Sequence, residues 1–123
     1  MGREVVLQDW TSLSGAAGTP GTKYATADSI VYVGDQETAV VAVDIVRIAA
    51  GVTVKLLTGP TRDGPWAATA PVKSWTAAAS ERLYLKRDPS LAVDKQMMAW
   101  LRWQVDFPGS AWDVTFTIVA VVG

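Results

Sequence analysis

The fold is decided by residues 101–122, which read LRWQVDFPGSAWDVTFTIVAVV. Apolar and polar side chains alternate over residues 101–107, as expected for a strand with one face buried and the other in water. The tripeptide PGS at residues 108–110 predicts a turn, and the alternation resumes over residues 112–118. This part of the chain is therefore predicted to form two strands joined by a short turn.

The same period of two recurs in the preceding sequence. Further strands are predicted at residues 5–10, 30–33, 38–48, 52–58 and 82–86. In the third of these, Val41, Val43 and Ile45 are expected to share one face. About seven to nine strands, separated by turn signals at roughly ten-residue intervals, favour an all-β protein built as an antiparallel sandwich or barrel. At most one short helix is expected.

The least regular parts of the sequence lie near its start and between the strands. Residues 77–82 are expected to form a helical turn, and residues 91–98 either a short helix or a loop. Residues 11–22 hold three Gly and one Pro, which predicts either a plain connector or a flexible arm that orders against a neighbouring subunit. We expect one domain, with an N-terminal strand and flexible Gly/Ala/Thr-rich arm in residues 1–35 and the sandwich body in residues 36–123.

The composition excludes several kinds of partner. Eleven Lys and Arg residues balance twelve Asp and Glu residues, which gives a net charge of −1. Because this chain has no basic excess to neutralise phosphates, nucleic-acid binding is not expected. The longest apolar segment, residues 116–122, is too short to cross a bilayer as a helix, and the N-terminus lacks a signal-peptide pattern. We therefore expect a soluble protein made in a cytoplasm, with no membrane partner.

The sequence offers few residues for catalysis. It contains no Cys and no His, which removes the commonest nucleophile–base pairs and transition-metal ligands. Ser74 follows Lys73, but adjacent residues of a strand point to opposite faces. A pair of carboxylates is the remaining catalytic arrangement, and the candidates are Asp44, Asp63, Asp106 and Asp113. We expect these side chains to occupy solvated strand positions or turns instead of a catalytic site. No metal-binding or phosphate-binding spacing is present, so we expect no cofactor and a protein that is not an enzyme.

Tryptophan is the unusual feature of the composition, with six residues in 123. Trp103 and Trp112 are predicted to fill the core, because Trp buries a large area. Trp66 and Trp75 are predicted to lie at the surface, because turn-like sequence surrounds both. Trp is also enriched at binding hot spots, and Met makes adaptable contacts. The candidate contact residues for a partner or ligand are Trp10, Trp66, Trp75, Trp100, Met97 and Met98.

Two stretches carry a resemblance to a known group of proteins. In residues 52–66 an alternating strand is followed by a turn that ends in Asp-Gly-Pro-Trp, and in residues 101–118 a Leu-Arg-Trp strand, a turn and a Phe-Thr-Ile strand follow one another. Together they resemble the small jelly-roll-like β-sandwich proteins of tailed bacteriophages, which decorate heads or build tail parts. Residues 1–35 lie outside the resemblance.

The resemblance implies a jelly-roll-like sandwich and a structural role in a virus particle. The implied protein is a capsid decoration or cement protein in the virion, which docks on a shell lattice as a homo-oligomer. Its implied partners are a major capsid protein or a tail protein, and no catalytic residues are carried over. Two alternatives remain open: a carbohydrate-binding sandwich that uses Trp66, Trp75 or Trp112 as a stacking platform, and an enzyme that uses two carboxylates.

Overall fold

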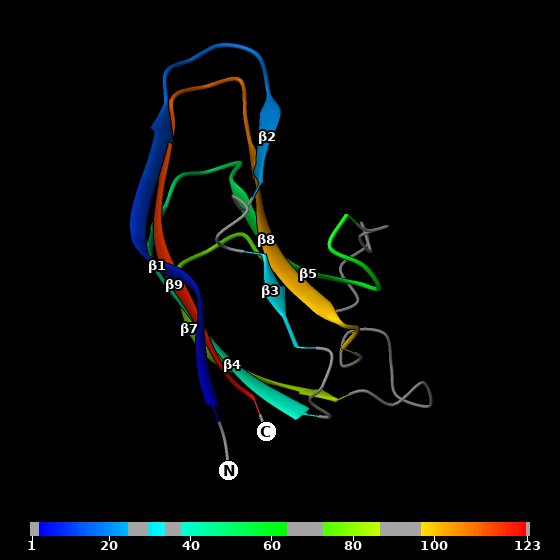
Figure 1. The fold of residues 1–123 in the computed structure, drawn as a ribbon. Coiled ribbons are helices and arrows are strands. Elements are labelled where there is room, and N and C mark those ends of the chain that lie inside the picture. Colours follow the sequence, from blue (N-terminus) through cyan, green and yellow to red (C-terminus); the bar gives the residue numbers. More distant parts are fainter. Residues whose placement is uncertain (1–2, 25–29, 34–37, 64–72, 87–96, 123) are drawn as a thin grey trace.

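The computed structural model describes residues 3–24, 30–33, 38–63, 73–86 and 97–122, which form two antiparallel sheets (Figure 1). Sheet A has the strand order β1 (Arg3–Gly15), β9 (Trp112–Val122), β4 (Thr38–Ile48) and β7 (Ala79–Lys86). Sheet B has the order β2 (Gly21–Tyr24), β8 (Trp100–Phe107), β5 (Thr53–Gly59) and β6 (Lys73–Trp75), and the short β3 (Val31–Tyr32) also pairs with β8. The predicted all-β sandwich is confirmed.

The strands pair in a nested order. β1 pairs with β9, β2 with β8, β4 with β7 and β5 with β6, all antiparallel. Each pair of strands thus encloses the next pair in chain order, which is the connectivity of a jelly roll. The connections β1–β2, β4–β5, β6–β7 and β8–β9 each lead from one sheet to the other. Figure 1 shows the first and last of these side by side, at the end of the sandwich opposite the two termini.

The core fills the space between the two sheets. Alternate residues of β4, β5, β8 and β9 point inward and are almost completely buried, in agreement with the predicted pattern; they include Val41, Val43, Ile45, Val54, Leu56, Leu101, Val105, Val114, Phe116 and Ile118. Trp103 and Trp112 are also buried there, as predicted. The indole of Trp103 meets the ring of Phe116 edge-on, with 5.3 Å between ring centroids. Each such large side chain contributes about 1.5–3 kcal/mol by leaving water.

A bulge in β1 ties the edge of sheet A to the core. The pairing of β1 with β9 shifts register on both sides of Gln8. The Gln8 carbonyl accepts a hydrogen bond from the Thr117 hydroxyl at 2.9 Å, and its side-chain oxygen accepts one from Trp103 Nε1 at 3.1 Å. Bulges of this kind re-aim a side chain at a sheet edge, and here the bulge supplies the polar partner that a buried indole needs.

The glycine-rich segment near the N-terminus is not the flexible arm that its composition suggests. Residues 11–15 continue β1, and residues 21–24 form β2. Gly15 faces Trp112 and Gly21 faces Phe107 across the strands, and the two aromatic rings stack at 4.8 Å between centroids. A Cβ on Gly15 would lie 2.3 Å from Trp112 Nε1. Glycine is therefore needed here for close aromatic packing, which is a property of a strand and not of a linker.

The start of β7 corrects a second expectation. Residues 77–82 were expected to form a helical turn because alanine favours helices, but β7 begins at Ala79 and pairs with β4 from there onward. Helix propensity is a weak preference that tertiary pairing overrides. The expected helix or loop at residues 91–98 falls largely outside the described residues.

Candidate interaction surface

One polar network lies on the outward face of sheet B, around Asp106. The Asp106 carboxylate accepts hydrogen bonds from Thr22 Oγ1 and Gln104 Nε2, both at 2.9 Å, and pairs with Lys55 Nζ at 2.6 Å. Burial alone would raise the pKa of Asp106, but the hydrogen bonds from Lys55, Gln104 and Thr22 and the charge of Lys55 hold the pKa below its ordinary value. The carboxylate is thus kept ionised and occupied by donors, which suits cross-strand cohesion better than proton transfer.

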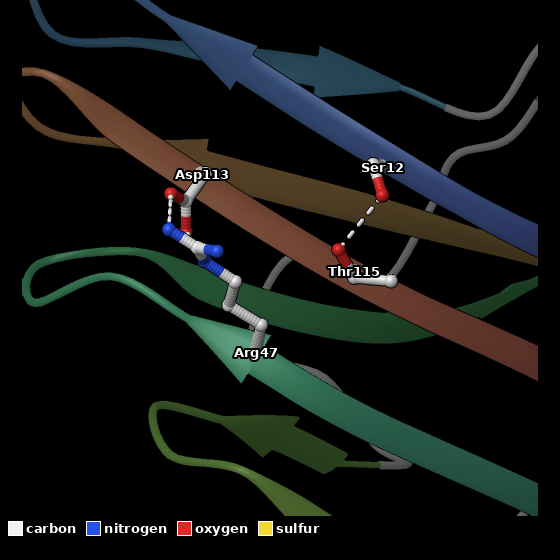
Figure 2. A network of polar contacts seen from close by, with 4 residues as sticks. All are labelled: Ser12, Arg47, Asp113 and Thr115. Atoms are coloured by element: carbon white, nitrogen blue, oxygen red, sulfur yellow. Dashed lines mark hydrogen bonds and ion pairs between the residues drawn. The ribbon is translucent and has the colours of Figure 1, made fainter.

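A second polar network lies on the outward face of sheet A. Arg47 of β4 reaches across to Asp113 of β9 with two contacts, from Nε at 3.0 Å and from Nη2 at 2.8 Å (Figure 2). Figure 2 also shows Ser12 of β1 and Thr115 of β9, whose hydroxyl groups are 2.8 Å apart. The Arg47–Asp113 pair and the Ser12–Thr115 pair together join the neighbouring strands β1, β9 and β4 along their solvated face, as cross-strand polar pairs commonly do.

The candidate carboxylates Asp44, Asp106 and Asp113 do not form a catalytic pair with one another. Asp106 faces outward from sheet B, whereas Asp44 and Asp113 face outward from sheet A. Asp44 lies opposite Thr117, four residues along β9 from Asp113. At about 3.3 Å per residue the two are roughly 13 Å apart along the strand, beyond the roughly 5–9.5 Å that separates paired carboxylates in glycosidases. Asp44 is instead bound by the Ser80 hydroxyl.

The structure separates five of the six candidate contact residues into three groups. Trp75 and Met97 belong to the core, with exposed fractions of 5% and 2%, so the predicted surface position of Trp75 is wrong. Trp75 is buried because β6 pairs with β5 and sets it opposite the inward Val54. Trp10 on β1 is 54% exposed. Trp100 and Met98 are half-buried, and Trp66 lies outside the described residues.

Trp100 forms an aromatic pair with a residue that the sequence reasoning did not single out. Tyr32 of β3 and Trp100 of β8 are direct cross-strand partners, with ring centroids 5.0 Å apart and a 60° angle between the rings. Tyr32 is largely exposed. Trp100 alternates with the inward Leu101, so the aromatic pair lies on the outward face of sheet B.

A buried threonine fixes the chain just before this pair. Thr58 Oγ1 donates to the Trp100 carbonyl at 2.9 Å and accepts from the Met98 amide at 2.8 Å. Thr58 itself is fully buried. The backbone that carries Trp100 is therefore held by a side chain inside sheet B, and the aromatic pair is presented on a rigid support.

A larger apolar surface lies on the outward face of sheet A. Two cross-strand rows run over it: Val6 beside Val119 and Ala42, and Val121 beside Val40 and Tyr84. Tyr84 is 77% exposed, and Val6 and Val121 are each 46% exposed. We call this surface the apolar patch, defined by Val6, Val40, Ala42, Tyr84, Val119 and Val121.

Sequence reasoning overlooked the apolar patch, although part of its signal was available. Tyr84 lies between Leu83 and Leu85 in the predicted strand 82–86, and alternation along a strand places Tyr84 on the face opposite the two leucines. The valines of β9 gave no such signal, because the run at residues 118–122 is apolar on both faces. Such a run is typical of a strand covered on both sides, whereas here one side is open.

The described residues lack two features that would point to a membrane or a metal ion. Among them no helix is long and apolar enough to cross a membrane. Within the same ranges no three acidic side chains gather in a way that would hold a metal ion. Comparisons with models of known protein families, with curated proteins and with solved structures give no significant match to the chain.

Proposed function

We propose that this chain is a non-enzymatic structural protein of a virus particle, most specifically a capsid decoration or cement protein. The observation that carries the proposal is the presence of two apolar surfaces on opposite faces of one rigid sandwich. The apolar patch covers part of sheet A, and the aromatic pair Tyr32–Trp100 faces outward from sheet B. A cement subunit has to touch at least two neighbours at once, and this arrangement allows it.

The chemistry of the two surfaces supports contact with other proteins. Exposed apolar patches on a soluble domain commonly mark interaction sites, and Trp and Tyr are enriched among the residues that dominate binding energy. A net charge of −1 neither steers the chain toward polyanions nor repels it strongly from a shell. Jelly rolls are used by capsid proteins and by lectins alike, so the architecture favours this class of role only by analogy.

Association with particles is the first test of the proposal. Particles are purified from the culture that makes the protein, sedimented through a density gradient, and searched for the chain by mass spectrometry. We expect the protein to sediment with the particles at a constant ratio to the main shell protein. A protein that stays entirely in the soluble fraction contradicts the proposal.

A rebinding experiment then locates the contact. Particles stripped of the protein are mixed with the recombinant wild type or with Trp100→Ala, and bound protein is measured after sedimentation. Loss of a central aromatic anchor should weaken binding by about 2 kcal/mol or more, which is roughly 30-fold. Trp10→Ala is the matched control, because it removes an exposed Trp outside both surfaces and should leave binding within about twofold.

The aromatic pair also gives specific support to the alternative, a carbohydrate-binding module. Two tilted rings with one largely exposed member offer an apolar platform on which a sugar ring can stack. Titration of the intrinsic tryptophan fluorescence with a panel of glycans tests this alternative, with Trp100→Ala as the variant that should lose the response. No change in fluorescence with any glycan removes it.

A further inference from the structure

We infer that the outward face of sheet A binds a second copy of this chain, in a symmetric dimer whose two-fold axis runs parallel to the strands between β9 and β4. The inference names the partner of the apolar patch and leaves the aromatic pair on sheet B open for a different partner. It concerns the isolated protein, so it does not depend on the proposed role in a particle.

The shape of the patch suits a second sheet. Six apolar side chains lie in two adjacent rows, each of which spans three of the four strands of sheet A. Faces of this kind pack on one another with strand directions aligned to within about 30° and sheets about 10 Å apart, as in a sandwich core. The polar contacts Arg47–Asp113 and Ser12–Thr115 occupy the same face farther along the strands, where they provide the polar rim that such interfaces have.

Charges at the two edges of the patch favour a copy of the chain over an unrelated apolar partner. Glu4 lies on β1, in the same row as Val121 and Tyr84, at one edge. Arg82 and Lys86 lie on β7 at the other edge, one on each side of Tyr84, and all three charged side chains are on exposed residues. Arg82 also pairs with Asp44 of the neighbouring β4 at 3.9 Å, so Lys86 carries the uncompensated positive charge of this pair of residues. The patch is therefore acidic on one side and basic on the other, with an uncharged centre.

A two-fold axis parallel to the strands brings these edges together. It lays β1 of one copy over β7 of the other, so that Glu4 meets the partner's Tyr84 between the partner's Arg82 and the partner's Lys86. The same contact is repeated on the other side of the axis, because a two-fold interface uses each surface twice. An axis across the strands would instead lay β7 over β7 and bring like charges together, which disfavours that arrangement. The charges thus select one orientation.

The area of the face is sufficient for a stable dimer. Four strands spaced at about 4.8 Å give a width of roughly 19 Å, and eleven residues at about 3.3 Å give a length of roughly 36 Å. The projected face is then roughly 700 Å², and its accessible area is larger because side chains project from it. A standard interface buries about 800 Å² per partner, so a copy that covers most of this face reaches that size.

The mass of the purified full chain in solution tests the inference. Sedimentation equilibrium is measured over a concentration series, without any particle or added ligand. We expect a reversible dimer for the wild type. Val121→Lys places a charge in the centre of the interface, and Val6→Lys sets a positive charge against the partner's Arg82. Each should raise the dimer dissociation constant roughly 30-fold or more. Tyr32→Lys is the matched control on sheet B, where Tyr32 is 49% exposed, and should leave the constant unchanged.

A charge exchange tests the orientation. Glu4→Lys sets three positive charges together and should raise the dissociation constant roughly fivefold, and adding Lys86→Glu should bring it back toward the wild-type value. Circular dichroism and urea unfolding confirm that each variant is folded. A wild type that is monomeric at every concentration, a dimer that survives Val6→Lys and Val121→Lys, or an exchange that fails to restore the dimer overturns the inference. Because no particle is present, none of these results bears on the particle proposal.

Discussion

Replacing Thr58 by Val tests how the aromatic pair is supported. Val has nearly the shape of Thr but lacks the hydroxyl, so the Met98 amide and the Trp100 carbonyl lose the partner that holds them at 2.8 Å and 2.9 Å. A buried group left without its hydrogen bond costs about 1–3 kcal/mol. Because Met98 and Trp100 are only half-buried, water replaces part of what is lost. We therefore expect Thr58→Val to lower the free energy of unfolding by about 2 kcal/mol.

Thr58→Ser is the matched control, because it keeps the hydroxyl and removes one methyl group. Its cost is the transfer and cavity energy of that methyl, about 1 kcal/mol. Urea unfolding followed by circular dichroism gives both values. At about 4 °C per kcal/mol for a chain of this size, the melting temperature should fall by about 8 °C for Val and about 4 °C for Ser. A serine variant that is less stable than the valine variant refutes the reasoning, because packing and not hydrogen bonding would then dominate.

Three further predictions follow from contacts described above. Gly15→Ala forces a methyl group against the Trp112 indole, 2.3 Å from Nε1, and should lower the free energy of unfolding by about 1–3 kcal/mol. The control is Gly18→Ala, whose Cβ would meet nothing closer than 4.0 Å. It should change the free energy of unfolding by less than about 0.5 kcal/mol in the same denaturation assay. The lowered pKa of Asp106 means that the stability contributed by its carboxylate is complete above pH about 4 and is lost as the pH falls through the folded-state pKa. The free energy of unfolding, measured from neutral to acidic pH, should therefore fall less for Asp106→Asn than for the wild type. An equal fall would contradict the assignment. Trp103→Phe removes an indole hydrogen bond of 3.1 Å and part of a core ring, and should lower stability by about 2–3 kcal/mol by calorimetry; an unchanged melting temperature would contradict the assignment of this residue to the core.

The strands with the cleanest alternation could be predicted from sequence. β4 spans the predicted residues 38–48, and β8 and β9 begin within one residue of the predicted starts. In these strands one face is buried and the other solvated, so the periodicity of the sequence reports directly on the environment of each side chain. The sandwich class followed from them. The nested order of the strands could not be read in this way, because periodicity carries no information on which strand pairs with which.

Composition misled the prediction where a small residue serves packing. Residues 11–15 contain Ser, Thr and Gly and were assigned to a flexible arm, yet they form the end of β1. What holds them there lies on the distant β9: the Thr115 hydroxyl meets Ser12, and the Trp112 ring covers Gly15. A local reading of sequence cannot detect a partner that lies about 100 residues away.

The candidate contact residues show the same limit. Trp75 was placed at the surface because its neighbours in sequence resemble a turn, but pairing with β5 sets it opposite Val54 and into the core. Trp10 and Trp100 keep exposed surface. Only the structure distinguishes these two tryptophans from the buried ones. The apolar patch needs four strands to exist at all, so no single segment of the sequence contains it.

The position of β9 in the centre of sheet A has a consequence for how the chain is made. Within that sheet β9 is the only described strand that joins β1 to β4, and it follows both of them in the sequence. Until Trp112–Val122 has left the ribosome, β1 has no neighbour in its sheet and its open edge is available to other unfinished chains. Sheet A therefore closes only when two strands roughly 100 residues apart in sequence have met, and contacts of such long sequence separation slow folding.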